Sequence, residues 1–414
     1  MQNFLRSLCF LRVQLGHESA ENFQNFFLNL TALALTMSIN VLQLRASTGF
    51  GGAENIILSS CQNLDSRRFR ASILTTFPAR FESNFLADAA QRLGIPCHTL
   101  RYDHRFSPAG VRYFLRYLDE HKIDIVHAHG YRENILAGLG AYYKNIATVS
   151  TAHGWITDPV RTQIDLWALK ALHRIVAVSP SVEEKLLRAG FKKDRIVLLL
   201  NAVDVRQFHR QAPCPSLQEQ FGIAPGTFVI GTAARLSPEK GLADLIRAAQ
   251  QVVKQCPQVK FLIVGDGPER AVLEKLAVEL GLQDFVSFAG YQENVAAFYN
   301  LMNLYASPSL QEAMPKSLLE AAACELPIVA TAVGGVPQII QPGETGVLLP
   351  AGDPQRLAAE IIRLIQNPGL GEQYGRKARE LICAKFSETE AIKKLENIYA
   401  EVFAEVRRPN RRSH

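Results

Sequence analysis

The sequence lacks several patterns that define common classes of protein. Its seven cysteines are scattered, and the closest pair, Cys61 and Cys97, is 36 positions apart, so no CxxC spacing for metal or redox chemistry occurs. No uninterrupted apolar run reaches the length of about 18 residues that a membrane-spanning helix needs. No predicted strand is followed by the dinucleotide-binding pattern GxGxxG. Scattered thiols in a chain of 414 residues are typical of a reducing compartment, so a cytoplasmic protein is expected.

A DxD motif is also absent, because no two of the 13 aspartates are separated by a single residue. Such paired carboxylates hold a divalent ion on a diphosphate. Without them, Arg, Lys and helix N-termini would have to balance the charge of a departing diphosphate. Three histidines near predicted strand ends, His127, His129 and His153, have no acid or cysteine at the usual ligand spacing. We therefore expect no metal and no cofactor.

The charge of the chain is unevenly distributed. Residues 37–202 carry 21 basic and 14 acidic side chains, whereas residues 203–406 carry 18 basic and 23 acidic ones. A basic first half suggests a face that meets an anionic ligand or lipid headgroups. A random excess of surface charge is the alternative.

Short apolar runs alternate with helical patterns, which predicts two tandem Rossmann-like α/β domains with doubly wound parallel sheets. The rhythm breaks at 203–222, where Pro213 and Pro215 indicate a linker. Strands are predicted at residues 39–44, 71–76, 123–127, 146–152, 175–179 and 196–200, and then at 228–232, 259–264, 286–289, 304–307, 328–331 and 346–349.

Three consecutive helical patterns, at 354–366, 371–385 and 387–406, end the chain, and the last is expected to return to the first domain. Met37 stands just before the first predicted strand, so residues 1–36 are interpreted as an N-terminal extension or as an over-long translation start. The expected divisions are therefore 1–36, a first domain 37–205, a linker 206–222, a second domain 223–385, a crossing helix 386–406 and a basic tail 407–414.

The strongest local pattern in the second half joins two acids, Glu312 and Glu320, across a predicted helix start. Pro315 suits the first turn of that helix, because its missing N–H costs nothing there. Glu312 then lies in the preceding loop and Glu320 inside the helix, an arrangement suited to an anion and a polyol together. A solvated acidic face is the alternative.

Two further loops are expected at the same edge of this sheet, since ligands of open parallel sheets bind at the carboxyl ends of the strands. Arg235 and Lys240 follow one strand and could neutralise a pyrophosphate; ordinary surface charge is the other reading. Gly265 and Gly267 follow the next strand and allow close backbone approach.

In the first half, Gly51 and Gly52 follow the first strand and open a helix, which brings backbone amides close to a phosphate or sugar. A plain flexible turn is the alternative. His153 is interpreted as a polar donor to a bound ligand, whereas His127 and His129 could equally be structural.

In their order and spacing these motifs resemble the GT-B-fold glycosyltransferases of family 4, from about Ile39 to Val406. Further carriers of the resemblance are Asn201-Ala202-Val203-Asp204, Gly265-Asp266-Gly267-Pro268, Leu326-Pro327-Ile328-Val329-Ala330, Gly334-Gly335-Val336-Pro337 and Gly343-Glu344-Thr345-Gly346. The chain departs from the usual family pattern at Ala202, Ala233-Ala234, Ala313, Glu325 and Gln338.

The resemblance implies a retaining transferase that binds a nucleoside-diphosphate sugar in the second domain and the acceptor in the first, across a cleft. Arg235 and Lys240 would bind the diphosphate, Glu320 the ribose, and Glu312 and His153 the transferred sugar; these residues other than Glu320 form the expected catalytic set. The wider donor site would comprise Gly51, Gly52, Gly265, Gly267, Ala313, Met314, Pro315, Lys316 and Ser317.

The expected acceptor is a lipid-linked or polysaccharide molecule of cell-envelope biosynthesis, such as a lipopolysaccharide precursor. The protein would then lie at the inner face of the cytoplasmic membrane, bound peripherally to its anionic surface, with no nucleic-acid partner. A nucleotide-sugar epimerase or hydrolase of the same fold, and a non-catalytic nucleotide-sugar-binding protein, are the alternatives. The sequence distinguishes neither uridine from guanosine nor one sugar from another.

Overall fold

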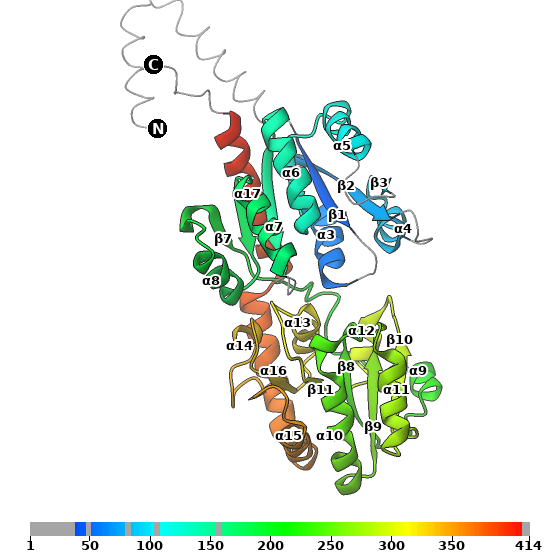
Figure 1. Ribbon diagram of the computed structural model, residues 1–414. Coiled ribbons are helices and arrows are strands. Elements are labelled where there is room, and N and C mark those ends of the chain that lie inside the picture. Colours follow the sequence, from blue (N-terminus) through cyan, green and yellow to red (C-terminus); the bar gives the residue numbers. More distant parts are fainter. Residues whose placement is uncertain (1–37, 47–50, 79–83, 103–107, 154–158, 408–414) are drawn as a thin grey trace, which may run out of the picture.

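Two α/β domains stack along the long axis of the molecule (Figure 1). The computed structural model describes residues 38–46, 51–78, 84–102, 108–153 and 159–407. Within these residues the strands form one seven-stranded and one six-stranded sheet, and every pairing between named strands is parallel. The predicted pair of doubly wound domains is thereby confirmed. The predicted extension at 1–36 and most of the basic tail lie outside the described residues.

The first sheet has the strand order β3-β2-β1-β4-β5-β6-β7. Side chains alternate across it: Leu42 and Leu44 of β1 pack into one core cluster and Val41 into another on the opposite face. Burial on both faces explains the continuous apolar runs of the sequence. The strands are β1 (Ile39–Ala46), β2 (Phe69–Pro78), β3 (Cys97–Tyr102), β4 (Ile125–Ala128), β5 (Ala147–Ala152), β6 (Arg174–Ala177) and β7 (Ile196–Leu198).

The helices between these strands pack against the sheet. They are α3 (Gly52–Asn63), α4 (Phe85–Arg92), α5 (Pro108–Glu120), α6 (Tyr131–Lys144), α7 (Pro159–Lys170), α8 (Pro180–Arg188) and the short 3₁₀ helix η1 (Lys193–Arg195). The strand order reverses between β1 and β4, and such a switch point is where ligands of doubly wound sheets bind.

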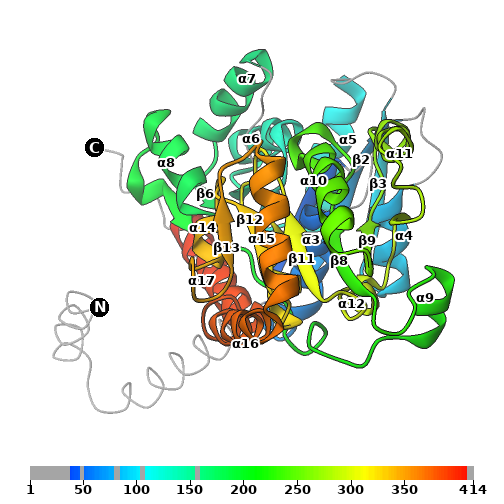
Figure 2. The same cartoon turned by 90° about the horizontal axis from the view of Figure 1, so that it is seen from below.

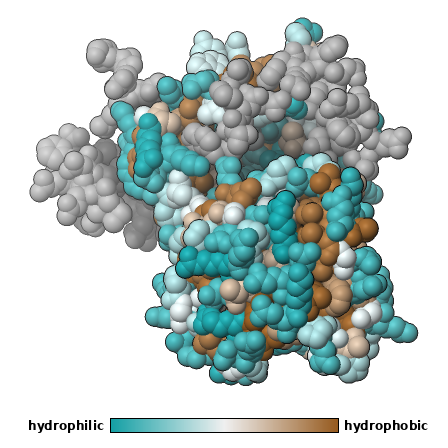
Figure 3. All heavy atoms as spheres, turned by 60° about the horizontal axis from the view of Figure 1, so that its bottom comes forward, coloured by the Kyte–Doolittle hydropathy of each residue, from teal (hydrophilic) through white to brown (hydrophobic). Residues whose placement is uncertain are grey.

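The second sheet has the order β10-β9-β8-β11-β12-β13; Figure 2 shows its strands from β9 to β13 from below. Its switch point lies between β8 and β11. The strands are β8 (Phe228–Ala233), β9 (Val259–Val264), β10 (Val286–Gly290), β11 (Leu304–Ser307), β12 (Ile328–Thr331) and β13 (Val347–Leu349). On the face of this domain seen in Figure 3, hydrophilic residues surround scattered apolar ones.

Helices lie on both sides of the second sheet, with α10 against α15 in one layer and α13 against α16 in the other. The helical elements are α9 (Pro215–Gln220), η2 (Pro238–Lys240), α10 (Leu242–Gln255), α11 (Arg270–Glu279), α12 (Val295–Tyr299), α13 (Lys316–Ala323), α14 (Val336–Ile339), α15 (Pro354–Gln366) and α16 (Pro368–Lys385).

The last helix, α17 (Glu388–Arg407), leaves the second domain and packs on the first sheet, as predicted (Figure 1). At the crossing, Val203 pairs with the segment that precedes the helix, because its N–H donates to the carbonyl of Phe386 at 3.0 Å. Tyr399 and Val402 are fully buried there, and the ring of Tyr399 lies 5.9 Å from that of Phe69. The helix therefore completes the core of the first domain.

Two elements differ from the sequence-based expectation. Strand β3 was not predicted, because it lies at the edge of the sheet and its sequence, CHTLRY, mixes polar with apolar residues. The predicted linker contains the six-residue helix α9, which begins at Pro215. An edge strand pairs with only one neighbouring strand, and a helix of six residues has few buried positions. Neither element therefore produces a strong apolar pattern in the sequence.

Candidate active site

The loops that follow β8, β9 and β11 meet at the carboxyl-terminal edge of the second sheet. The N–H of Leu236 donates to the carbonyl of Asp266 at 3.0 Å, and the N–H of Leu310 donates to the carbonyl of Glu239 at 2.8 Å. Because β9, β8 and β11 are neighbours in the sheet, these backbone bonds hold the three loops as one surface. It carries most of the residues that the sequence assigned to the donor.

An ion pair between Lys240 and Glu312 lies at the centre of this surface. The ammonium of Lys240, at the end of η2, is 2.7 Å from Oε1 of Glu312, and the hydroxyl of Ser309 donates to the same oxygen at 2.8 Å. The Glu312 side chain is only 8% exposed and that of Lys240 22%. The sequence placed both residues in the site, and the fold brings them into direct contact.

Glycines allow these loops to approach one another. A Cβ on Gly265 or Gly267 would overlap the backbone of Ala234 or Leu236. Gly334 has a φ of +55°, and a Cβ there would overlap the carbonyl oxygen of Glu312. The position of the Glu312 backbone thus depends on a glycine in the loop after β12.

Glu320 lies one turn inside α13 and is almost completely buried. The hydroxyl of Tyr299 donates to its Oε2 at 2.8 Å. Burial raises the pKa of Glu320, while the nearby charge of Lys316 and the bond from Tyr299 oppose that rise. Pro315 is the N-cap of α13, one residue before the first turn in which the sequence placed it.

Arg235 is exposed on the loop after β8, and its side chain makes no ion pair or hydrogen bond with the described part of the chain. It shares the loop with Lys240 and lies at the same edge of the sheet. The remaining residues assigned to the donor, 313–317, form the segment between Glu312 and the start of α13, where Met314 is buried.

The first domain presents the ends of β1, β4 and β5 to this surface. Gly51 is the N-cap of α3, just beyond the undescribed residues that follow β1. His129 follows β4 and His153 follows β5, and their rings are linked by a 2.8 Å bond between Nδ1 of His129 and Nε2 of His153. These strands are neighbours, so the glycines and both histidines share one edge.

The edges of the two domains are in contact. A Cβ on Gly52 would lie 3.7 Å from the Cβ of Lys316, so α3 and α13 begin against each other. The side-chain amide of Asn201 donates to the carbonyl of Met314 at 2.7 Å. The sequence-assigned residues of the first domain therefore face those of the second.

A charged group beside the first-domain edge was missed by sequence reasoning. Arg45, near the end of β1, pairs with the buried carboxylate of Glu54 at 2.8 Å and donates to the carbonyl of His129. Glu133 is buried close by and accepts a 3.0 Å bond from Thr76. Burial raises the pKa of Glu133, and the charge of Arg45 opposes this. The available signal was the charge of Arg45 near the end of the first predicted strand.

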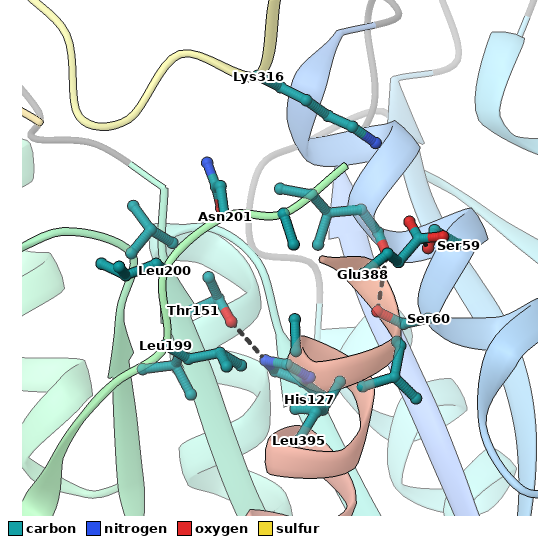
Figure 4. A pocket seen from close by; sticks show the side chains of 16 residues that line it. Ser59, Ser60, His127, Thr151, Leu199, Leu200, Asn201, Lys316, Glu388 and Leu395 are labelled. Atoms are coloured by element: carbon teal, nitrogen blue, oxygen red, sulfur yellow. Dashed lines mark hydrogen bonds between the residues drawn. The ribbon is translucent and has the colours of Figure 1, made fainter. Parts of the chain in front are cut away.

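A small cavity of about 60 Å³ lies where the two domains and α17 meet (Figure 4). His127 and Thr151 line it from the first sheet, joined by a 2.7 Å bond between Nε2 and Oγ1. Asn201 of the connecting segment and Lys316 of the second domain also line it. Residues of both domains and of the segment that connects them therefore line one small space.

Among the described residues, no group of three or more His, Cys, Asp and Glu side chains could hold a metal ion. None of the helices in the described ranges combines the length and apolarity needed to cross a bilayer.

The fold places the protein in a known structural class. The Anabaena protein HepE, solved with UDP and glucose, superposes with a TM-score of 0.77 at 23% identity, over 88% of this chain and all of that one. The chain thus has the GT-B architecture.

Sequence comparisons identify the family. Residues 50–207 match the family described as Glycosyltransferase Family 4, and residues 215–381 match Glycosyl transferases group 1. N-acetyl-alpha-D-glucosaminyl L-malate synthase of Bacillus anthracis is 30% identical over 68% of this chain and 75% of its own length. A lipopolysaccharide core biosynthesis glycosyltransferase of Rhizobium meliloti is 30% identical over 55% of this chain and 63% of its own length. The chain belongs to glycosyltransferase family 4, as the motifs predicted.

Proposed function

We propose that this glycosyltransferase moves a sugar from a nucleoside-diphosphate sugar to a lipid-linked or polysaccharide acceptor, with retention of anomeric configuration and without a metal ion. The observation that carries the proposal is the Lys240–Glu312 ion pair, whose two residues come from the loops on either side of the switch point of the second sheet. It unites a cation for a departing diphosphate with polar groups for a sugar.

The departing diphosphate gathers negative charge as the anomeric C–O bond breaks through an oxocarbenium-like transition state. Arg235 is exposed and free to move toward that charge, while Lys240 is held in place by Glu312. The glycine-rich loop at 265–267 lets backbone approach the same region. Fixed cations that meet developing charge are a large source of rate enhancement.

Glu312 would hold the transferred sugar instead of attacking it. Its Oε1 already accepts bonds from Lys240 and Ser309, which lowers its nucleophilicity and leaves Oε2 to accept from sugar hydroxyls. With no nucleophile needed, an oxygen of the leaving group would take the acceptor's proton, and the acceptor would attack from the same face. The buried carboxylate of Glu320 would accept from the ribose hydroxyls.

The proposed acceptor lies at a membrane surface. The first domain carries the basic half of the sequence and several exposed aromatic side chains, including Tyr142 and Trp167, which are 81% and 69% exposed. Aromatic and basic groups together favour a lipid–water interface. Co-sedimentation with anionic vesicles that weakens with salt is expected; binding that ignores both lipid charge and salt contradicts this part of the proposal.

A thermal-shift panel of nucleoside diphosphates and nucleotide sugars, run in excess chelator, tests the donor. A ligand at about 100 times its Kd stabilises the folded state by about 2.7 kcal/mol, so one base should stand out. Transfer is then measured with that donor, with and without acceptor. Product formed without acceptor would favour an epimerase or hydrolase, tight binding without turnover would favour a binding protein, and strict dependence on Mg²⁺ or Mn²⁺ would contradict metal independence.

A further inference from the structure

A continuous chain of hydrogen bonds connects the C-terminal helix with His153. Gln43 of β1 and His127 of β4 are register partners on the face of the sheet that α17 covers. The amide nitrogen of Gln43 lies 3.0 Å from the hydroxyl of Tyr399, and its amide oxygen lies 2.7 Å from Nε2 of His129. His129 in turn contacts His153 at 2.8 Å.

The donor and the acceptor of each hydrogen bond in this series follow from the groups that can donate. The amide oxygen of Gln43 can only accept, so His129 carries its proton on Nε2. Burial lowers the pKa of His129 well below its usual value, with the neighbouring histidines and Arg45 adding to the effect. A neutral ring has one proton, so Nδ1 of His129 accepts and Nε2–H of His153 donates to it.

The pKa of His153 is likewise lowered by burial, and then by Arg45. The ring is therefore neutral as well, and its single proton is already used on Nε2. Nδ1 of His153 is left with a lone pair, and it has no hydrogen-bond partner among the described residues. His153 directly follows β5, at the edge of the sheet that faces the second domain, so a ligand between the domains could use this lone pair.

The direction of a second branch of hydrogen bonds follows from the same orientation of the Gln43 amide. The hydroxyl of Tyr399 accepts from Gln43 and therefore donates to Nδ1 of His127, 2.6 Å away. His127 then donates from Nε2 to Oγ1 of Thr151, as Figure 4 shows. All three rings hold their proton on Nε2, and every bond in both branches has one donor and one acceptor.

We propose that Gln43 and Tyr399 are positioning residues that fix the tautomer of His153, so that its Nδ1 accepts a hydrogen bond from a hydroxyl of the transferred sugar. The proposal rests on the proposed function for the identity of the ligand. It differs from the sequence-based interpretation, in which His153 was a donor. It also makes α17, a helix contributed after the second domain, part of the active site in the first.

The test is the ¹⁵N spectrum of histidine-labelled full-length protein, in which protonated and unprotonated ring nitrogens have well-separated shifts. The ring ¹⁵N signals of His153 are assigned as those that disappear from the spectrum of the His153→Gln variant. The wild-type protein should show the proton of His153 on Nε2. A proton on Nδ1 would overturn the proposal, because donor and acceptor would then be exchanged in every hydrogen bond of the series.

Two variants test the positioning role. Gln43→Met removes the acceptor for His129, so the proton of His129 should move to Nδ1 and that of His153 to Nδ1 as well. Tyr399→Phe releases the Gln43 amide and should give a mixture of both tautomers. Tyr117→Phe, which also removes a hydroxyl from a buried tyrosine of the first domain, is the matched control and should leave the tautomer unchanged.

Kinetics separate this proposal from the proposed function. Gln43→Met and Tyr399→Phe should lower kcat/KM for the donor about tenfold, the effect of one lost hydrogen bond, with the melting temperature followed in parallel. Unchanged His153 tautomers in both variants would refute the positioning role. If Gln43→Met does not fold, Tyr399→Phe and the wild-type spectrum still decide. The expected tautomer in a protein that transfers no sugar would refute the proposed function and leave the hydrogen-bond chain intact.

Discussion

Lys240 and Glu312, 72 positions apart in sequence, form an ion pair with 2.7 Å between Nζ and Oε1. The two residues come from loops after neighbouring strands, β8 and β11. Each restrains the other: the carboxylate of Glu312 holds the ammonium of Lys240 in place, and both side chains are mostly removed from solvent. In the proposed reaction, this ion pair would place the cation of Lys240 before the substrate binds.

Replacing Lys240 with Ala should lower kcat by roughly 10²–10³-fold, the usual cost of losing one group that stabilises developing charge. Turnover with the donor found in the thermal-shift panel measures the effect, and circular dichroism reports whether the fold persists. Lys377→Ala, an exposed lysine on α16, serves as the control. Full activity of the Lys240 variant would remove this residue from the mechanism.

Glu320→Gln should raise KM for the donor about 10–100-fold, the range expected for a lost hydrogen bond to a charged group. The effect on kcat should be smaller, because the ribose lies away from the bond that breaks. Glu372→Gln, on the exposed face of α16, is the matched control. An equal loss in kcat with unchanged KM would contradict a ribose-binding role.

Gly334→Ala should reduce both stability and activity. An alanine at φ +55° costs about 1–2 kcal/mol, and its Cβ would also displace the Glu312 backbone. Gly343→Ala is a close control, since Gly343 has a φ of +77° but open space around a Cβ. Urea unfolding should show a loss of stability in both variants. Turnover should fall only in the Gly334 variant. Equal activity in the two would mean that Gly334 does not position Glu312.

Acid should destabilise the first domain below about pH 6.5, the ordinary histidine pKa. Burial lowers the pKa of His127 to about 3, so the unfolded chain binds a proton there that the folded chain does not. The resulting stability is complete above the unfolded pKa and is lost as the pH falls toward the folded pKa; at pH 5 the loss for His127 is about 2 kcal/mol.

Urea unfolding between pH 5 and 8 measures this effect. His127→Gln should flatten part of the dependence, whereas His121→Gln, an exposed site on the same domain, should not. A wild-type unfolding midpoint that stays constant from pH 8 to 5 would show that the buried histidines do not take up protons on unfolding.

The sequence by itself determined the architecture and the list of chemical groups. Buried parallel strands must be continuously apolar, so their positions could be read directly, and β9, β11 and β12 begin and end where predicted. The order and spacing of motifs that include Gly51, Lys240, Glu312 and Glu320 pointed to the family, which the sequence comparisons then showed. Edge strand β3 was not predicted, because a strand at the edge of a sheet can form with few apolar residues.

Only the tertiary structure decided which of these groups act together. Contact between Lys240 and Glu312 depends on strand order, which local patterns do not encode. The partnership of Gln43 with Tyr399 spans 356 positions and requires α17 to fold back on the first sheet. Hydrogen bonding has a direction that is set by neighbours in space, so the proton position on His153 follows from that packing and from no feature of the sequence around it.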